Sequence, residues 1–211
     1  MSNMAQDSEP ARIRLFAGEL EEMARKEIEK RRRLGNEASA MVFGREVGQL
    51  ALRLADAGAR VIAEATAEAL PAHPGLRTLP FSLAKLPAAD TLPEAPFDII
   101  VGQLAVHSIP YEQAQQALCR LVSLLKIGGK LYLSAYGLHS MLGDHYPDSG
   151  KLVEERFAEL PPALASLYDL QGPVCLYSER NLITLLFQVG TPVLQSATGA
   201  LGNIRAVAVR I

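Results

Sequence analysis

Two glycines flank a carboxylate in the segment GREVG, residues 44–48, which separates an apolar run from an amphipathic pattern. Glycine turns let a backbone approach a nucleotide-like ligand closely, because no Cβ atom stands in the way. Such turns need several glycines, and here Glu46 occupies the position between Gly44 and Gly48. Either this turn binds a ligand despite its carboxylate, or the two glycines only shape a strand-to-helix connection.

Groups that can accept a proton or a hydrogen bond are concentrated further along the chain. His107 follows an apolar run, and YGLHSMLGDHYPD contains Tyr136, His139, Asp144 and His145. Imidazole is the side chain best suited to proton transfer near neutral pH, although a histidine in such a loop more often packs than reacts. Metal binding by the last two histidines lacks a third ligand at recognisable spacing, so we expect no metal site.

Alternating strands and helices must position these groups. Apolar runs predict strands near 39–43, 60–64, 76–81, 97–102 and 130–135, and amphipathic patterns predict helices over 48–58 and 111–126. This alternation predicts a parallel sheet with helices on both faces. FDIIV, residues 97–101, is apolar after its Asp and is typical of a central strand.

The two ends of the chain differ from this alternation. Residues 1–38 read as a polar leader followed by a surface helix, whose Arg31 to Arg33 suit the negative end of the helix dipole. Residues 39–211 form the main domain, in which 138–176 is an irregular lid. A helix capped by Ser178 follows the lid, and strands near 193–198 and 204–210 form a hairpin that adds an antiparallel strand.

Four segments together resemble the class I S-adenosylmethionine-dependent methyltransferases, especially their small-molecule branch: VFGREVGQLALRLADAGARV, FDIIVGQLAVHSIP, ALCRLVSLLKIGGKLYLSAYG and YSERNLITLLFQVG. The resemblance runs from about residue 39 to residue 211. It implies a Rossmann-like α/β fold with a mostly parallel seven-stranded sheet, an antiparallel strand in the C-terminal hairpin and helices on both faces. It also implies S-adenosylmethionine as cofactor.

The resemblance assigns the cofactor's methionine part to the turn of Gly44, Glu46 and Gly48, where the family has a third glycine in place of the carboxylate. Glu46 either bonds the cofactor's ammonium or fills its space and repels its carboxylate. Glu64 stands near the acidic position that holds the ribose hydroxyls, one residue off in an ungapped alignment.

Two further strand ends complete the implied cofactor contacts. Ser82 replaces an Asp that binds the adenine amino group in many family members, and the backbone of the neighbouring Leu83 remains available for that contact. A serine in this place is also an ordinary turn residue. Gly102, Gln103 and Leu104, after the fourth strand, are expected to face the cofactor.

Two functions from different classes follow. The first is methyl transfer to a small molecule, with His107 or His139 as a base and Tyr136 at the acceptor, under the lid. The second is a binding or scaffold protein that kept the fold and lost the cofactor, because the departures at Glu46, Ser82 and Glu64 fall on three separate cofactor contacts. Binding of another nucleotide at the same strand ends is a weaker alternative.

Composition limits the classes of partner that the protein is expected to bind. The net charge is −2 and the pI is about 6.1, which argues against a general nucleic-acid binder. No uncharged apolar run of about 18 residues can span a membrane, and the first residues lack a signal core. Cys119 and Cys175 lie far apart, so we expect two buried thiols, a reducing compartment and a cytoplasmic protein. A protein partner or a homodimer is compatible with this composition.

Overall fold

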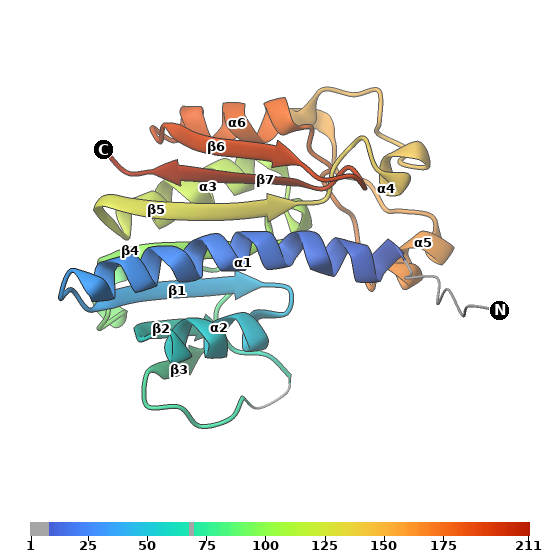
Figure 1. The fold of residues 1–211 in the computed structure, drawn as a ribbon. Coiled ribbons are helices and arrows are strands. Elements are labelled where there is room, and N and C mark those ends of the chain that lie inside the picture. Colours follow the sequence, from blue (N-terminus) through green and yellow to red (C-terminus); the bar gives the residue numbers. More distant parts are fainter. Residues whose placement is uncertain (1–8, 68–69) are drawn as a thin grey trace.

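The computed structural model describes residues 9–67 and 70–211, which form a sheet with helices on both sides (Figure 1). The helices are α1 Glu9–Arg33, α2 Val47–Asp56, α3 Tyr111–Ser123, α4 Met141–Asp144, α5 Pro162–Leu167 and α6 Glu179–Gln188. The strands are β1 Ala38–Gly44, β2 Ala59–Glu64, β3 Leu76–Leu79, β4 Phe97–Gln103, β5 Leu125–Ala135, β6 Val193–Thr198 and β7 Ile204–Val209. Short 3₁₀ turns occupy Ala89–Thr91, Val106–Ser108 and Val153–Glu155.

The seven strands form one sheet in the order β3-β2-β1-β4-β5-β7-β6. The pairs from β3 to β5 are parallel, whereas β7 runs antiparallel to both β5 and β6. Strand β4 is central and every residue in it is buried, as its apolar run predicts. The structure therefore confirms the mostly parallel seven-stranded sheet and its C-terminal hairpin.

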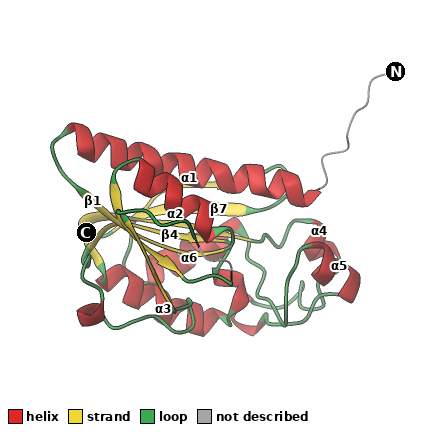
Figure 2. Cartoon of the chain, turned by 90° about the horizontal axis from the view of Figure 1, so that it is seen from below, coloured by secondary structure: helices red, strands yellow, loops and turns green. Residues whose placement is uncertain are grey.

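Helices cover both faces of the sheet, as the view from below shows (Figure 2): α1 and α2 pack on one face, and α3 and α6 on the other. On one face, Leu20 and Ile28 of α1 and Leu50 of α2 pack against Val42 and Val101. On the other face, α3 and α6 cover alternate residues of the same strands. Because successive side chains of a strand point to opposite faces, each strand contributes to two separate apolar cores.

The limits of α3, β5 and β3 differ from the sequence prediction. Helix α3 ends at Ser123 and β5 already begins at Leu125, whereas the helix was expected to reach 126. The amide of Phe97 donates to the carbonyl of Leu124, which starts the β4 and β5 pairing with an irregular register. Strand β3 ends at Leu79 and not at 81, because Pro80 has no N–H to continue the ladder.

The predicted lid contains α4 and α5 and covers a third apolar cluster, which includes Leu104, Tyr136, Tyr146 and Tyr168. Helix α6 begins at the predicted cap: Ser178 and Asn181 bond reciprocally to one another's backbone amides. Cys175 is buried, but Cys119 is exposed, so the expectation of two buried thiols was wrong for one of them. Among the described residues, no helix has the length and apolar character that crossing a membrane requires.

Candidate functional site

Three strand ends meet at the carboxyl edge of the sheet. The amide of Gly44, the last residue of β1, donates to Glu64 Oε2 at the end of β2 over 2.8 Å. Gly44 also lies beside Gln103 at the end of β4, and the amide of Arg45 donates to the Gln103 carbonyl over 2.8 Å. The structure thus brings Gly44, Glu64 and Gln103 together at the edge where open parallel sheets bind ligands.

Only glycine fits at position 44. Its φ is +102°, and a Cβ atom there would lie 2.1 Å from the Gln103 carbonyl oxygen. At Gly48 a Cβ atom would lie 2.4 Å from Cδ2 of Leu70, so this glycine admits the loop that follows β2. Glu46 precedes α2 with φ +53°, in the left-handed region that favours glycine, and its side chain is exposed.

Two polar side chains at this edge have capacity for a ligand. Burial raises the pKa of Glu64 above its ordinary value, and the hydrogen bond from the Gly44 amide only partly offsets this. Gln103 is 4% exposed, and its Oε1 has no hydrogen-bond partner among the described residues. Hydroxyl or ammonium donors of a ligand would satisfy both groups, which otherwise bear a desolvation cost.

Ser82 and Leu83 lie in the turn that follows β3. Ser82 and Lys85 exchange backbone hydrogen bonds of 2.9 and 3.3 Å, which is the turn role foreseen for this serine. Leu83 is buried in the same apolar cluster as Ala105 and Val106, which follow β4. The turn after β3 is therefore packed beside the segment that leaves β4.

An aromatic group lies beyond the end of β4. The rings of His107 and Tyr136 meet edge to face with their centroids 4.6 Å apart, and Tyr136 meets Tyr168 of the lid at 5.8 Å. Burial, together with the charge of Arg45, lowers the pKa of His107 to about 3. His107 is therefore neutral at pH 7, and its Nδ1 has no hydrogen-bond partner among the described residues.

His139 lies in a hollow of about 570 Å³ between the lid and the tip of the β6–β7 hairpin. Residues 138–141, 143, 144 and 149 form one wall, and Ala200 and Leu201 form the other. His139 and Asp144 are exposed there, whereas His145 is exposed but does not line the hollow. Within the described parts of the chain, no group of three His, Cys, Asp or Glu side chains is arranged to hold a metal ion.

No protein-family model matches the sequence, and no curated protein matches it. Solved structures do match the fold. A 1,6-didemethyltoxoflavin-N1-methyltransferase from Burkholderia thailandensis superposes with a TM-score of 0.61 at 17% identity, over 90% of this chain and 78% of that chain. Its structure contains 1,6-didemethyltoxoflavin and S-adenosylhomocysteine. The chain has the class I methyltransferase fold.

Two further class I structures support this. Magnesium protoporphyrin IX methyltransferase from Synechocystis PCC 6803, with S-adenosylmethionine bound, matches with a TM-score of 0.58 at 16% identity, over 98% of this chain and 86% of that chain. An S-adenosylmethionine-dependent methyltransferase from Mesorhizobium loti matches with a TM-score of 0.61 at 14% identity, over 82% and 91%. The likeness therefore extends over most of the class I fold and not over a single motif.

Two further residues lie at the carboxyl edge of the sheet. Arg45, in the glycine turn, donates to the carbonyl of Asp169 over 2.8 Å and lies 3.4 Å from its carboxylate, so the turn holds the lid. Leu104 has φ +46°, and its amide donates to Ser134 Oγ over 2.9 Å. Leu104 was expected to face the cofactor, whereas Arg45 was not singled out, although a charged residue between the two glycines was a visible signal.

Proposed function

We propose that the protein transfers a methyl group from S-adenosylmethionine to a small-molecule acceptor. The observation that carries this proposal is the convergence of Gly44, Glu64 and Gln103 at the carboxyl ends of β1, β2 and β4. Solved structures of the same fold hold S-adenosylmethionine or S-adenosylhomocysteine, and one of them holds its small-molecule substrate. A cytoplasmic location belongs to the same proposal, and a protein partner or homodimer stays a prediction.

The residues at the strand ends fit this cofactor. The half-buried Glu64 carboxylate would hold the ribose hydroxyls. Gln103 Oε1, which has no hydrogen-bond partner among the described residues, would accept from a donor of the methionine part. Because Gly44 has no side chain, the cofactor would be able to approach the backbone closely at this position. The cofactor would supply a methyl group on a sulfonium, which is already an activated leaving group. The remaining task of the chain is to hold the acceptor in line with that methyl group.

Of the two histidines expected as a base, we assign proton transfer to His139. A histidine whose pKa is about 3 is a weak base at neutral pH, so His107 acts here as a buried neutral ring that supports Tyr136. His139 is exposed in the hollow and is the base available to an acceptor there. Tyr136, between His107 and the lid residue Tyr168, forms the aromatic wall of the acceptor side.

Calorimetric titration with S-adenosylmethionine tests the proposal and separates it from a cofactor-free scaffold. The wild type is expected to bind, and Glu64→Gln to bind at least about tenfold more weakly, because a charged acceptor of the ribose is lost. Glu112→Gln, on the exposed start of α3, is the matched control and should bind like the wild type. A wild type that releases no binding heat with millimolar S-adenosylmethionine would contradict the proposal.

A further inference from the structure

Asn203 is a deeply buried polar side chain at the carboxyl edge of the sheet. It is 1% exposed, and neither its Oδ1 nor its Nδ2 has a hydrogen-bond partner among the described residues. A buried carboxamide without partners costs free energy that an apolar residue would not. Unpaired buried groups of this kind call for a ligand or another function.

The register of the sheet shows which way this side chain points. Ala135 of β5 lies opposite Ile204 of β7, and both side chains belong to the core beneath α3 and α6. Because side chains alternate along a strand, Asn203 points to the other face, as Tyr136 does. The two chains stay close beyond the ladder, since a Cβ atom on Gly137 would lie 1.6 Å from the Gly202 carbonyl oxygen.

Asn203 is therefore expected to lie near the aromatic group. Tyr136, its expected neighbour across the strands, contacts His107 and Tyr168. The two walls of the hollow begin just beyond Gly137 and Gly202, at Leu138 and Leu201. Asn203 does not line the hollow, but the preceding Gly202 lies against the backbone of His139 and Ser140, which do line it. A ligand edge that extends inward from the hollow would meet the carboxamide.

The chemistry of the carboxamide selects the ligand. It offers one carbonyl acceptor and one amino donor side by side, and a lactam or carboxamide edge presents the complementary pair. The nearby charge on Arg205 is already paired with Glu19 of α1, so it supplies no counter-charge for an ionised ligand. Burying an ionised ligand against a neutral amide would be costly.

We infer that Asn203 recognises an uncharged lactam or carboxamide edge of the methyl acceptor, with the hollow lined by residues 138–141, 143, 144, 149, 200 and 201 as its entrance. That the bound molecule is the methyl acceptor rests on the proposed function. Its binding to Asn203 does not require the cofactor. Asn203 is in this sense a specificity-determining residue.

Stability measurements separate recognition from a structural role. Asn203→Ala and Asn203→Leu are expected to keep or raise the melting temperature, by up to about 2–4 °C, because a buried unpaired amide is removed. The matched control is Asn181, whose Oδ1 accepts from Ser178 and from Arg156 at 3.0 Å. Asn181→Leu should lower the melting temperature by about 4–8 °C. A comparable loss in both Asn203 variants would show a structural role and overturn the inference.

Binding measurements complete the test. Saturation-transfer NMR with 2-pyridone and nicotinamide should show binding to the wild type, and nicotinate, which is ionised, should not bind. Both Asn203 variants should bind 2-pyridone at least about tenfold more weakly while their S-adenosylmethionine affinity stays that of the wild type. Absence of 2-pyridone binding in the wild type, or unchanged binding in the variants, would overturn the inference. Failure of S-adenosylmethionine binding alone would overturn only the proposed function.

Discussion

Glu46 illustrates how one residue can depart from a motif without closing the site. Its backbone holds φ +53°, which the glycine of the usual turn would adopt without strain, and its side chain is exposed. Its carboxylate makes no capping hydrogen bond to the first turn of α2. Replacement of the family's glycine by Glu46 therefore strains the backbone first, and affects contact with a ligand only second.

Replacing Glu46 by glycine is expected to raise the free energy of unfolding by about 1 kcal/mol, because the left-handed conformation is strained for a residue with a Cβ atom. Urea denaturation measures this. Gln49→Gly, at an exposed position inside α2, is the control and should lose about 1 kcal/mol. If Glu46→Gly instead lost stability, the interactions of the carboxylate would outweigh the strain.

His107 makes the stability of the protein depend on pH. Its pKa is lowered to about 3 by burial and by Arg45, whereas an unfolded histidine has a pKa of about 6.5. Below about pH 6.5, His107 binds a proton in the unfolded chain but not in the folded chain. The stability that the neutral His107 contributes is therefore present above that pH and is lost as the pH falls toward 3.

The expected slope from His107 is about 1.4 kcal/mol of unfolding free energy per pH unit between pH 6 and pH 4. Urea denaturation at pH 7, 6 and 5 measures it in the wild type and in His107→Gln. The variant should lose that slope, because carboxylates contribute mainly at lower pH. Equal slopes in both proteins would mean that His107 is protonated when folded.

Among the elements, the lid is held by the turn that borders the cofactor edge. Arg45 bonds the backbone carbonyl of Asp169, and Tyr168 beside it contacts Tyr136. Arg45→Ala should therefore speed amide hydrogen exchange in residues 162–172 without unfolding the sheet. Asp169→Asn keeps the carbonyl bond and loses only an exposed ion pair, so it should exchange like the wild type. Equal exchange in wild type and Arg45→Ala would show that the aromatic contacts alone hold the lid.

The elements were largely predictable because their signals are local. The apolar run of β4 and the cap at Ser178 each identify an element within a few residues. The start of β5 was not predictable in this way, since it depends on pairing between Phe97 and Leu124. At the site, the resemblance pointed to Glu64 and Gln103, and both lie at the expected edge. The bond from Arg45 joins residues 124 positions apart, and no local pattern records it.

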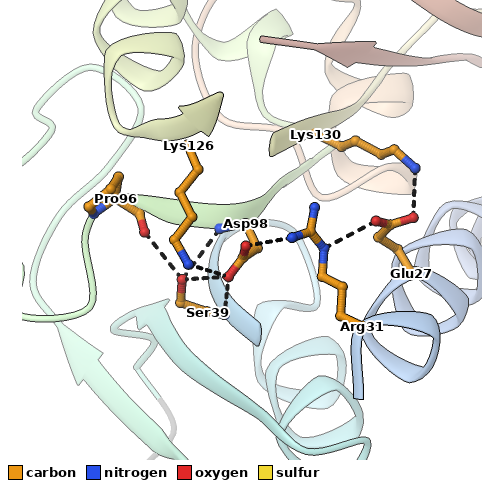
Figure 3. Close-up of polar contacts among 7 residues, drawn as sticks. All are labelled: Glu27, Arg31, Ser39, Pro96, Asp98, Lys126 and Lys130. Carbon is orange, nitrogen blue, oxygen red and sulfur yellow. Dashed lines mark hydrogen bonds and ion pairs between the residues drawn. The ribbon is translucent and has the colours of Figure 1, made fainter. Parts of the chain in front are cut away.

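At the scale of the whole molecule, the carboxyl and amino edges of the sheet have different roles. The carboxyl edge holds the candidate site, and the amino edge ties α1 to the sheet through a buried carboxylate (Figure 3). Asp98, at the start of β4, accepts from the Ser39 amide and from Lys126 over 2.8 Å, and pairs with Arg31 of α1 over 2.6 Å. Glu27 of the same helix pairs with Lys130 over 2.6 Å.

Asp98→Asn should lower the free energy of unfolding by about 3 kcal/mol, because it leaves two cations without their buried partner. Burial raises the pKa of Asp98, but the hydrogen bonds and charges of Lys126, Ser39 and Arg31 outweigh burial and hold that pKa below its ordinary value. The carboxylate therefore contributes stability above about pH 4, and its advantage over the variant fades in stronger acid.

Thermal melts from pH 7 to pH 3 measure this difference, with the exposed Asp90→Asn as a control that should melt like the wild type. S-adenosylmethionine titration of Asp98→Asn, well below its melting temperature, should give the wild-type affinity, because Gln103 lies at the opposite end of the same strand. Weakened cofactor binding in this variant would show that the two edges are coupled through β4. An unchanged melting temperature would instead show that α1 is held by its apolar face of Leu20 and Ile28 alone.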